Sequence, residues 1–221
     1  MKQLKFIVFF LILVLLLGLV SCDRKNANIS RPQETPPLNQ AMPYEVVGMG
    51  NLTNEDETRT VGLWYITSNK ADSFEEYAQT TIKATIDMYK EYKYNFTAVM
   101  LIPQPEVKTQ YAEAFYASDG EGATGMTGSV PAVPRYWNCR IMDDFPYNEE
   151  ELAVLKLWQS KQADFPNQDP LSSLSYDEPG LRQYIADTLN VSYEKTQPRS
   201  MKMVEYQVDE NVRALLWEIS D

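Results

Sequence analysis

The stretch that decides the fold is SFEEYAQTTIKATIDMYKEYKYNFTAVMLIP, residues 73–103, because a helix and a buried strand follow each other in it. Ser73 and Glu76 form the S-x-x-E capping box that begins a helix. Apolar residues then recur with helical spacing, which predicts a helix from about residue 74 to 93. The next run, residues 96–102, is apolar throughout and ends at a proline, which is typical of a central strand covered on both faces.

Two more strands are predicted on the amino-terminal side of this stretch. Residues 44–49 form the first, and a polar break separates it from the second, residues 60–67. Apolar side chains of the second strand alternate between its faces, with Trp64 on one face and Tyr65 on the other. A strand, a helix and a strand in succession favour a parallel pairing of residues 60–67 with residues 96–102.

The carboxyl-terminal side adds further strands and helices. Strands are predicted at residues 111–117 and 136–142. Two helix starts are predicted from residues that commonly cap helices: Asn148 with Glu151 begins one helix, and Asp177 begins the other. A short late strand and a terminal helix follow. The sum predicts an α+β domain, with a mixed, mainly antiparallel sheet and helices packed on one side.

The beginning of the chain resembles a bacterial lipoprotein signal. Two lysines precede an unbroken apolar run at residues 6–20, which is shorter than the roughly 20 residues that a helix needs to span a bilayer. The run leads into Leu19-Val20-Ser21-Cys22, which resembles the lipobox of bacterial lipoproteins. An ordinary signal peptide followed by a chance cysteine, or an uncleaved anchor, is the alternative.

The resemblance implies cleavage before Cys22 and attachment of acyl chains to that residue, which together hold a protein stably on a membrane. The expected organisation is a signal peptide at residues 1–21, a lipidated cysteine with a flexible tether at 22–42, and a single α+β domain at 43–221. The domain would face the periplasm or the extracytoplasmic space. Asp23 resembles the inner-membrane retention signal of enterobacterial-type sorting, and other bacteria follow different rules.

The chain is acidic and contains no histidine. Its formal net charge of −11 makes it a poor binder of nucleic acid or of anionic lipid headgroups, so membrane contact is expected through the acyl chains. The lack of histidine excludes Ser-His-Asp and Cys-His catalysis and histidine-ligated metal sites. Lipidation would leave Cys139 alone, as a buried strand thiol without an intrachain disulfide. No cofactor is expected.

The segment SDGEGATG, residues 118–125, has the G-x-G-x-x-G spacing of a dinucleotide-binding loop. In that fingerprint the glycines open a helix whose amino terminus faces the phosphates. Residues 126–134 contain glycine and prolines instead, so the segment is predicted to be a hairpin loop started by Asp119-Gly120. Calcium is a minor alternative, because Asp119 and Glu121 supply far fewer than the roughly six to eight oxygens that calcium takes.

Two groups of neighbouring carboxylates are candidates for acid–base chemistry. Asp143 and Asp144 are predicted to lie in a loop, and residues 149–151 are glutamates in the first turn of a helix. Negative charge is favourable at that end of a helix. Capping and solvation therefore explain both groups more simply than a glycosidase-like acid pair does.

Aromatic residues are numerous, with 14 Tyr, 8 Phe and 4 Trp, and core packing accounts for most of them. Those that flank the glycine-rich segment could instead form a surface that binds a protein, peptide or glycan, because such residues are enriched at interfaces. The residues predicted for this recognition surface are Tyr111, Phe115, Tyr116, Asp119, Tyr136 and Trp137.

The segments AQTTIKATIDMYKEYKYNFTAVMLIPQP and YAEAFYASDGEGATG together resemble a family of uncharacterised bacterial domains, over about residues 44–206. The resemblance implies a fold and transfers no catalytic residue. Three functions stay open. The favoured one is a non-enzymatic envelope lipoprotein that binds a protein, peptide or polymer, because no catalytic constellation stands out. The others are a lipid-anchored hydrolase that uses carboxylates, and an exclusion or immunity lipoprotein of a mobile element.

Overall fold

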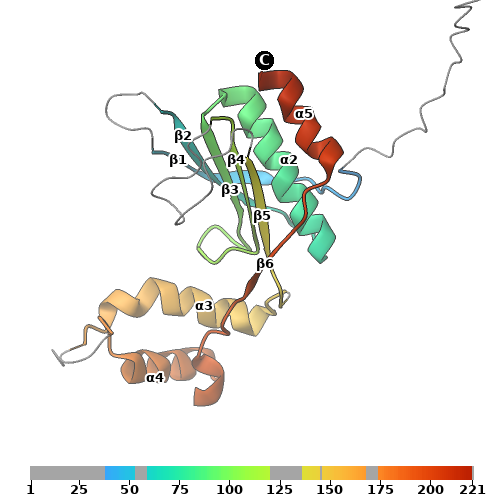
Figure 1. The fold of residues 1–221 in the computed structure, drawn as a ribbon. Helices are drawn as coiled ribbons and strands as arrows, with labels where there is room; N and C mark the ends of the chain where they lie inside the picture. Colours follow the sequence, from blue (N-terminus) through green and yellow to red (C-terminus); the bar gives the residue numbers. More distant parts are fainter. Residues whose placement is uncertain (1–37, 53–58, 120–135, 145, 168–173, 221) are drawn as a thin grey trace, which may run out of the picture. The chain divides into compact units, whose positions relative to one another are not determined.

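The computed structural model describes residues 38–52, 59–119, 136–144, 146–167 and 174–220 (Figure 1). The chain divides into two units, Met1–Thr35 and Pro36–Asp221, and all the described residues belong to the second. Within them, one sheet has its strands in the order of the sequence. The strands are β1 (Glu45–Asn51), β2 (Val61–Thr67), β3 (Phe96–Leu101), β4 (Ala112–Ala117), β5 (Tyr136–Met142) and β6 (Met203–Glu205).

The sheet is mixed. Neighbouring strands pair antiparallel, except that β2 and β3 are parallel. Helix α2 (Phe74–Tyr92) connects that parallel pair, because a parallel pair cannot be joined by a tight turn. The predicted α+β fold with a mixed, mainly antiparallel sheet is confirmed, and so is the strand–helix–strand unit around α2.

Helix α2 has the ends that its sequence predicts. The Ser73 hydroxyl accepts a hydrogen bond from the Glu76 backbone N–H at 3.3 Å, and the Glu76 carboxylate accepts one from the Ser73 N–H at 3.2 Å. This reciprocal pair is the capping box. The helix ends before Lys93, whose φ of 55° places it in the left-handed region that commonly terminates helices.

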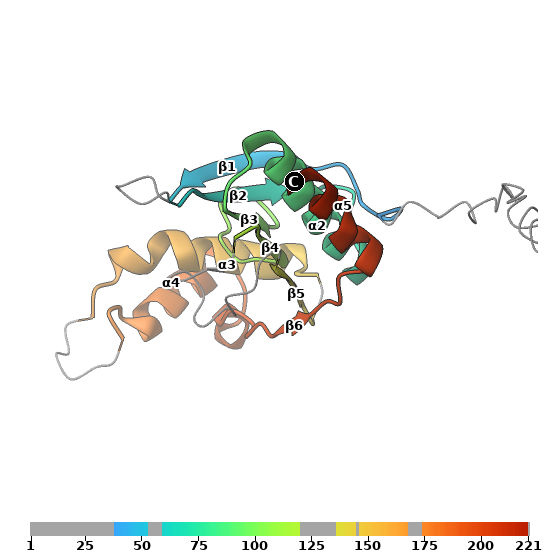
Figure 2. The same ribbon diagram turned by 45° about the horizontal axis from the view of Figure 1, so that its top comes forward.

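Helix α2 lies across β3, β4 and β5 and covers one face of the sheet (Figures 1 and 2). The strands turn alternate side chains toward it, including Trp64 on β2, Val99 on β3 and Tyr116 on β4. The helix contributes Ala78 and Ile82 to the same cluster. This is the main core, and we call this side of the sheet the inner face.

The opposite side of the sheet, which we call the outer face, carries a smaller apolar cluster. Among the described residues, every side chain in this cluster, and every apolar side chain packed on it, comes from a strand. Its buried members are Phe96, Ala98, Met100, Phe115 and Ala117, and Val61, Leu63, Tyr65 and Tyr136 are half-buried.

The helices that follow β5 form a separate pair. α3 (Glu149–Lys161) and α4 (Glu178–Leu189) pack on each other around Val154, Leu181 and Ile185. Both begin at predicted caps, because Asn148 exchanges hydrogen bonds with Glu151 and the Asp177 carboxylate accepts one from the Gly180 N–H. Two short 3₁₀ helices, η1 (Gln162–Asp164) and η2 (Tyr193–Thr196), follow α3 and α4 respectively.

The last helix, α5 (Glu210–Ser220), lies beside α2 in both views (Figures 1 and 2). Val208 and Val212 are buried in the main core. The prediction of helices on one side of the sheet therefore describes α2 and α5. Helix α3 adds Leu155 to the main core and packs Leu152 against it, while Val154 lies in the cluster shared with α4.

The segment just before β1 is attached to α2. The Gln40 backbone N–H donates to Gln79 Oε1 at 2.8 Å, and the Met42 N–H donates to Thr80 Oγ1 at 2.8 Å. Leu38 and Met42 also pack against the main core. Residues 38–42, which the sequence suggested as the end of the tether, therefore pack on the folded domain.

Within the described part of the chain, no helix is long and apolar enough to cross a bilayer. The apolar run at residues 6–20, the lipobox and Cys22 lie outside the described residues.

Candidate functional site

The sheet separates the residues predicted for the recognition surface onto its two faces. Tyr116 and Trp137 point to the inner face, where both are buried beneath α2. The Tyr116 ring packs edge-on against Tyr89, with centroids 4.7 Å apart, and lies 5.1 Å from the Trp137 ring. These two rings are core packing residues and offer no surface to a partner.

Tyr111 is also buried, and it directly precedes β4. Its ring lies between those of Tyr77 and Tyr147, with centroids 5.3 and 5.9 Å away, and its hydroxyl accepts a hydrogen bond from the Tyr147 N–H. Burial raises the pKa of Tyr77 to about 12, so this aromatic group stays neutral under ordinary conditions. Tyr111 therefore joins the sheet to the segment that leads into α3.

Phe115 on β4 and Tyr136 on β5 lie on the outer face. Phe115 is buried and stacks on Phe96 with a centroid distance of 5.8 Å. Tyr136 packs on the same cluster and is half-buried. Of the six predicted residues, Asp119 and Tyr136 are therefore the two that keep accessible surface.

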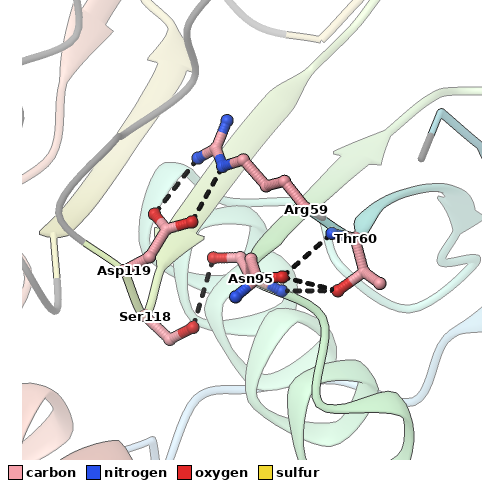
Figure 3. Close-up of polar contacts among 5 residues, drawn as sticks. All are labelled: Arg59, Thr60, Asn95, Ser118 and Asp119. Carbon is pink, nitrogen blue, oxygen red and sulfur yellow. Dashed lines mark hydrogen bonds and ion pairs between the residues drawn. The ribbon is translucent and has the colours of Figure 1, made fainter. Parts of the chain in front are cut away.

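Asp119 belongs to a polar cluster at one end of the sheet, shown in Figure 3. Its carboxylate accepts two hydrogen bonds from the Arg59 guanidinium, at 2.8 Å from Nε and 3.2 Å from Nη2. The Arg59 side chain is 14% exposed and that of Asp119 is 21% exposed. The guanidinium also lies over the Phe96 ring, 5.9 Å from its centroid. A bidentate, largely desolvated pair of this kind fixes geometry more firmly than an ordinary surface ion pair.

The other members of the cluster tie together the ends of β2, β3 and β4. Asn95 Oδ1 accepts from the Thr60 N–H and hydroxyl, both at 2.9 Å, and the Thr60 hydroxyl oxygen accepts from the Asn95 N–H at 3.0 Å. The Asn95 carbonyl accepts from the Ser118 N–H at 2.9 Å. The cluster thus holds the points at which residues 53–58 and 120–135 join the sheet (Figure 3).

The glycine-rich segment begins at this cluster. Ser118 and Asp119 are described, and Gly120, Gly122 and Gly125 lie outside the described residues. The next described element after Asp119 is the strand β5, which pairs with β4 as one side of a hairpin. The helix that a dinucleotide fingerprint requires would fall on residues 120–135, which lie outside the described residues.

Three of the carboxylates considered for acid–base chemistry have structural partners. Glu151 completes the capping box of α3, and Glu150 accepts from Lys195 Nζ at 2.9 Å. Asp143 lies 3.5 Å from Lys202 Nζ. Among the described residues, no three His, Cys, Asp or Glu side chains are grouped as a metal site would require.

Two buried ionisable groups, Glu113 on β4 and Cys139 on β5, lie on opposite faces of the sheet. Glu113 is buried on the outer face and forms an ion pair with Arg140, its partner across the strands. Burial raises the pKa of Glu113, and the Arg140 guanidinium offsets part of that shift. Cys139 is buried on the inner face, where desolvation raises the pKa of its thiol. A thiol in that state is a poor nucleophile, as predicted for a packing cysteine.

Sequence reasoning missed Arg59, Asn95 and Arg140. Each is a single polar residue that starts or interrupts a strand, and each takes its role from a residue on another strand. The available signal was an isolated arginine or asparagine beside strongly apolar residues, since a polar side chain in such a place needs a partner.

Comparison with known proteins bears on the fold. A crystal structure of a "DUF487 family protein" from Desulfovibrio piger ATCC 29098 is similar, with 20% identity and a TM-score of 0.55, over 78% of this chain and 98% of that one. At this identity the likeness shows a shared α+β fold alone. The chain belongs to a family called "Domain of unknown function (DUF4875)", whose model matches residues 39–198. No curated protein sequence matches the chain.

Proposed function

We propose that this protein is a lipid-anchored component of the bacterial cell envelope whose domain binds a protein, peptide or glycan partner and catalyses no reaction. The lipobox-like Leu19-Val20-Ser21-Cys22 after an apolar run carries the location. Acyl chains on Cys22 would hold the domain on the membrane, and Asp23 favours the inner membrane. The net charge of −11 argues against nucleic acid as the partner.

A binding role fits the described side chains better than the hydrolase alternative. A carboxylate-dependent hydrolase needs two carboxyl groups that face one substrate position, one of them with a raised pKa. Glu113 has the raised pKa, and its carboxylate is committed to Arg140 on a buried sheet face. Of the two carboxylate groups suggested by the sequence, Glu150 pairs with Lys195, Asp143 lies near Lys202, and Glu151 caps α3.

We place the contact with the partner at the end of the sheet that carries Asp119 and Tyr136. Rigid strand ends that support connecting segments are common sites of recognition. The Arg59–Asp119 pair and the Asn95–Thr60 contacts supply that rigidity. The half-buried Tyr136 supplies an aromatic ring with a polar hydroxyl, which is the residue type enriched at interfaces.

Replacing Cys22 with serine is expected to abolish lipid attachment and to stall processing or release the protein from the membrane, because the acyl chains need the thiol. The measurement is incorporation of labelled palmitate together with fractionation of cells that express the full chain. Cys139→Ser is the matched control, and it should keep both the label and the membrane fraction because Cys139 is buried in the domain. A Cys22→Ser protein that is still acylated and membrane-bound would refute the lipid anchor.

A photo-reactive benzoylphenylalanine in place of Tyr136 is expected to give a crosslinked adduct of a defined size in intact cells. The same substitution at Tyr184, an exposed tyrosine on α4, is the matched control and should give none. Adducts are read on denaturing gels and the partner is identified by mass spectrometry. Equal crosslinking at the two positions, or none at Tyr136, would count against this contact site.

A further inference from the structure

Strand β1 is an edge of the sheet in the described part of the chain, and its second half lacks the usual sequence features that protect an edge strand. In the described part of the chain it pairs with β2 alone (Figure 2). Natural edges are commonly blocked by lysine, proline or a bulge, because an open edge pairs with other chains. The sequence of β1, EVVGMGN, contains neither lysine nor proline, and its irregularity lies between Val46 and Gly48. The part from Gly48 onward therefore pairs regularly, and no described residue blocks it.

The backbone of Met49 faces away from β2. The Leu52 N–H donates to the Val61 carbonyl at 2.9 Å, which makes these two residues a hydrogen-bonded pair of the antiparallel ladder. Such pairs alternate along the strand, so Gly50 and Gly48 also bond toward β2. The N–H and C=O groups of Met49 then point outward, in position for one more strand.

The side chains beside this edge are apolar and exposed. Val46 and Met49 pair with Ile66 and Trp64, so they lie on the inner face, where they are 47% and 65% exposed. Tyr92, at the end of α2, is exposed as well, and its ring lies 5.4 Å from that of Trp64. Val46, Met49 and Tyr92 form what we call the edge strip.

On the outer face the regular part of this edge carries two glycines. Gly48 and Gly50 pair with Tyr65 and Leu63, and the Tyr65 ring occupies the space beside Gly48. An added strand would therefore meet apolar side chains on one face and bare backbone on the other. Alternating side chains of an extended peptide fit this arrangement, because successive residues point to opposite faces.

We propose that β1 takes up an extended segment of a partner protein as an additional strand, with apolar side chains on the edge strip and a neutral or basic net charge. Strand addition to an open edge is an established mode of peptide recognition, in which backbone hydrogen bonds give affinity and side-chain contacts give selectivity. The charge follows from the acidic chain, whose formal net charge of −11 disfavours a second copy of itself. This surface is additional to the proposed contact at Asp119 and Tyr136 and does not depend on the lipid anchor.

The test uses the full mature chain in detergent micelles and a fluorescein-labelled peptide of alternating valine and threonine with two lysines at each end. Saturable binding is expected by fluorescence anisotropy. Met49→Pro removes the outward N–H, and it should weaken binding about tenfold or more because backbone hydrogen bonds are lost. Met49→Thr keeps that N–H, and it should weaken binding less than Met49→Pro does.

A second probe keeps the test independent of the folding of the proline variant. The same peptide N-methylated at alternate residues keeps its side chains and charge, and loses the N–H groups that a strand donates. It should not bind the unchanged protein. Absence of binding by the first peptide, or equal binding of both peptides, overturns the proposal. A dimer of the unchanged protein in sedimentation that Met49→Pro disperses would also overturn it, because the occupant would then be a second copy.

Discussion

Gly62→Ala is expected to lower the free energy of unfolding by about 3 kcal/mol, near the upper end of what an overpacked core site costs. Gly62 and Trp64 lie on the same face of β2, two residues apart. A Cβ at position 62 would overlap ring carbons of both Trp64 and Tyr94. The indole is 1% exposed and lies against the rings of Tyr92 and Tyr94, so these rings or the backbone of β2 would have to shift.

Gly50→Ala is the matched control for this prediction. Gly50 lies on the neighbouring strand, and a Cβ there would be 3.9 Å from Leu63 Cβ, an ordinary van der Waals contact. Its effect should stay within about 0.5 kcal/mol, the usual range for substitutions without a structural conflict. Urea denaturation followed by circular dichroism measures both. Equal stabilities of the two variants would show that the aromatic group beside Gly62 repacks at little cost.

The parts of the fold that the sequence predicted are those with local signals. Two helices begin with a capping box, in which the cap residue and its partner are three positions apart: Ser73 with Glu76, and Asn148 with Glu151. A short-range pattern is therefore enough to locate the start of both helices. The apolar run of β3 and the alternation in β2 likewise depend on neighbouring residues. Each of these predictions is confirmed with boundaries within a residue or two.

The candidate site was predicted less completely, because it depends on which face of the sheet α2 covers. Phe115 and Tyr116 are adjacent in the sequence and point to opposite faces, one to the outer face and one to the main core. The alternation along the strand shows that the two side chains point to opposite faces. It does not show which of the two faces is covered by α2. The Arg59–Asp119 pair joins residues 60 positions apart, and no short-range signal connects them.

The second large loss of stability is predicted for the ion pair between Glu113 and Arg140 on the outer face. Glu113 on β4 is 3% exposed and lies directly across from Arg140 on β5. On the same face it adjoins the apolar side chains of Met100 and Phe115. A carboxylate in such a place depends on its cation, because removing one partner of a buried ion pair leaves an uncompensated charge.

Arg140→Met is therefore expected to lower the free energy of unfolding by about 3 kcal/mol at pH 7, at the lower end of the range for a broken buried pair because Arg140 is partly exposed. Burial already raises the pKa of Glu113 above its ordinary value, and loss of the guanidinium would raise that pKa further. A raised carboxyl pKa means that the folded state binds the proton more tightly than the unfolded state does. The loss of stability in Arg140→Met is then fully present above the raised pKa of Glu113. It becomes smaller as the pH falls toward 4.5, the ordinary pKa of a glutamate side chain.

The measurement is urea denaturation of the protein and of Arg140→Met at pH 7 and at pH 5, with the smaller difference expected at pH 5. Glu113→Leu combined with Arg140→Met removes both charges and places apolar side chains among Met100 and Phe115. This double variant should recover most of the loss at pH 7, and its difference from the unchanged protein should vary little with pH, because the ionisable carboxyl is gone. A loss in Arg140→Met that is equal at both pH values, or a double variant as unstable as the single one, would mean that Arg140 stabilises the sheet by packing and not by its charge.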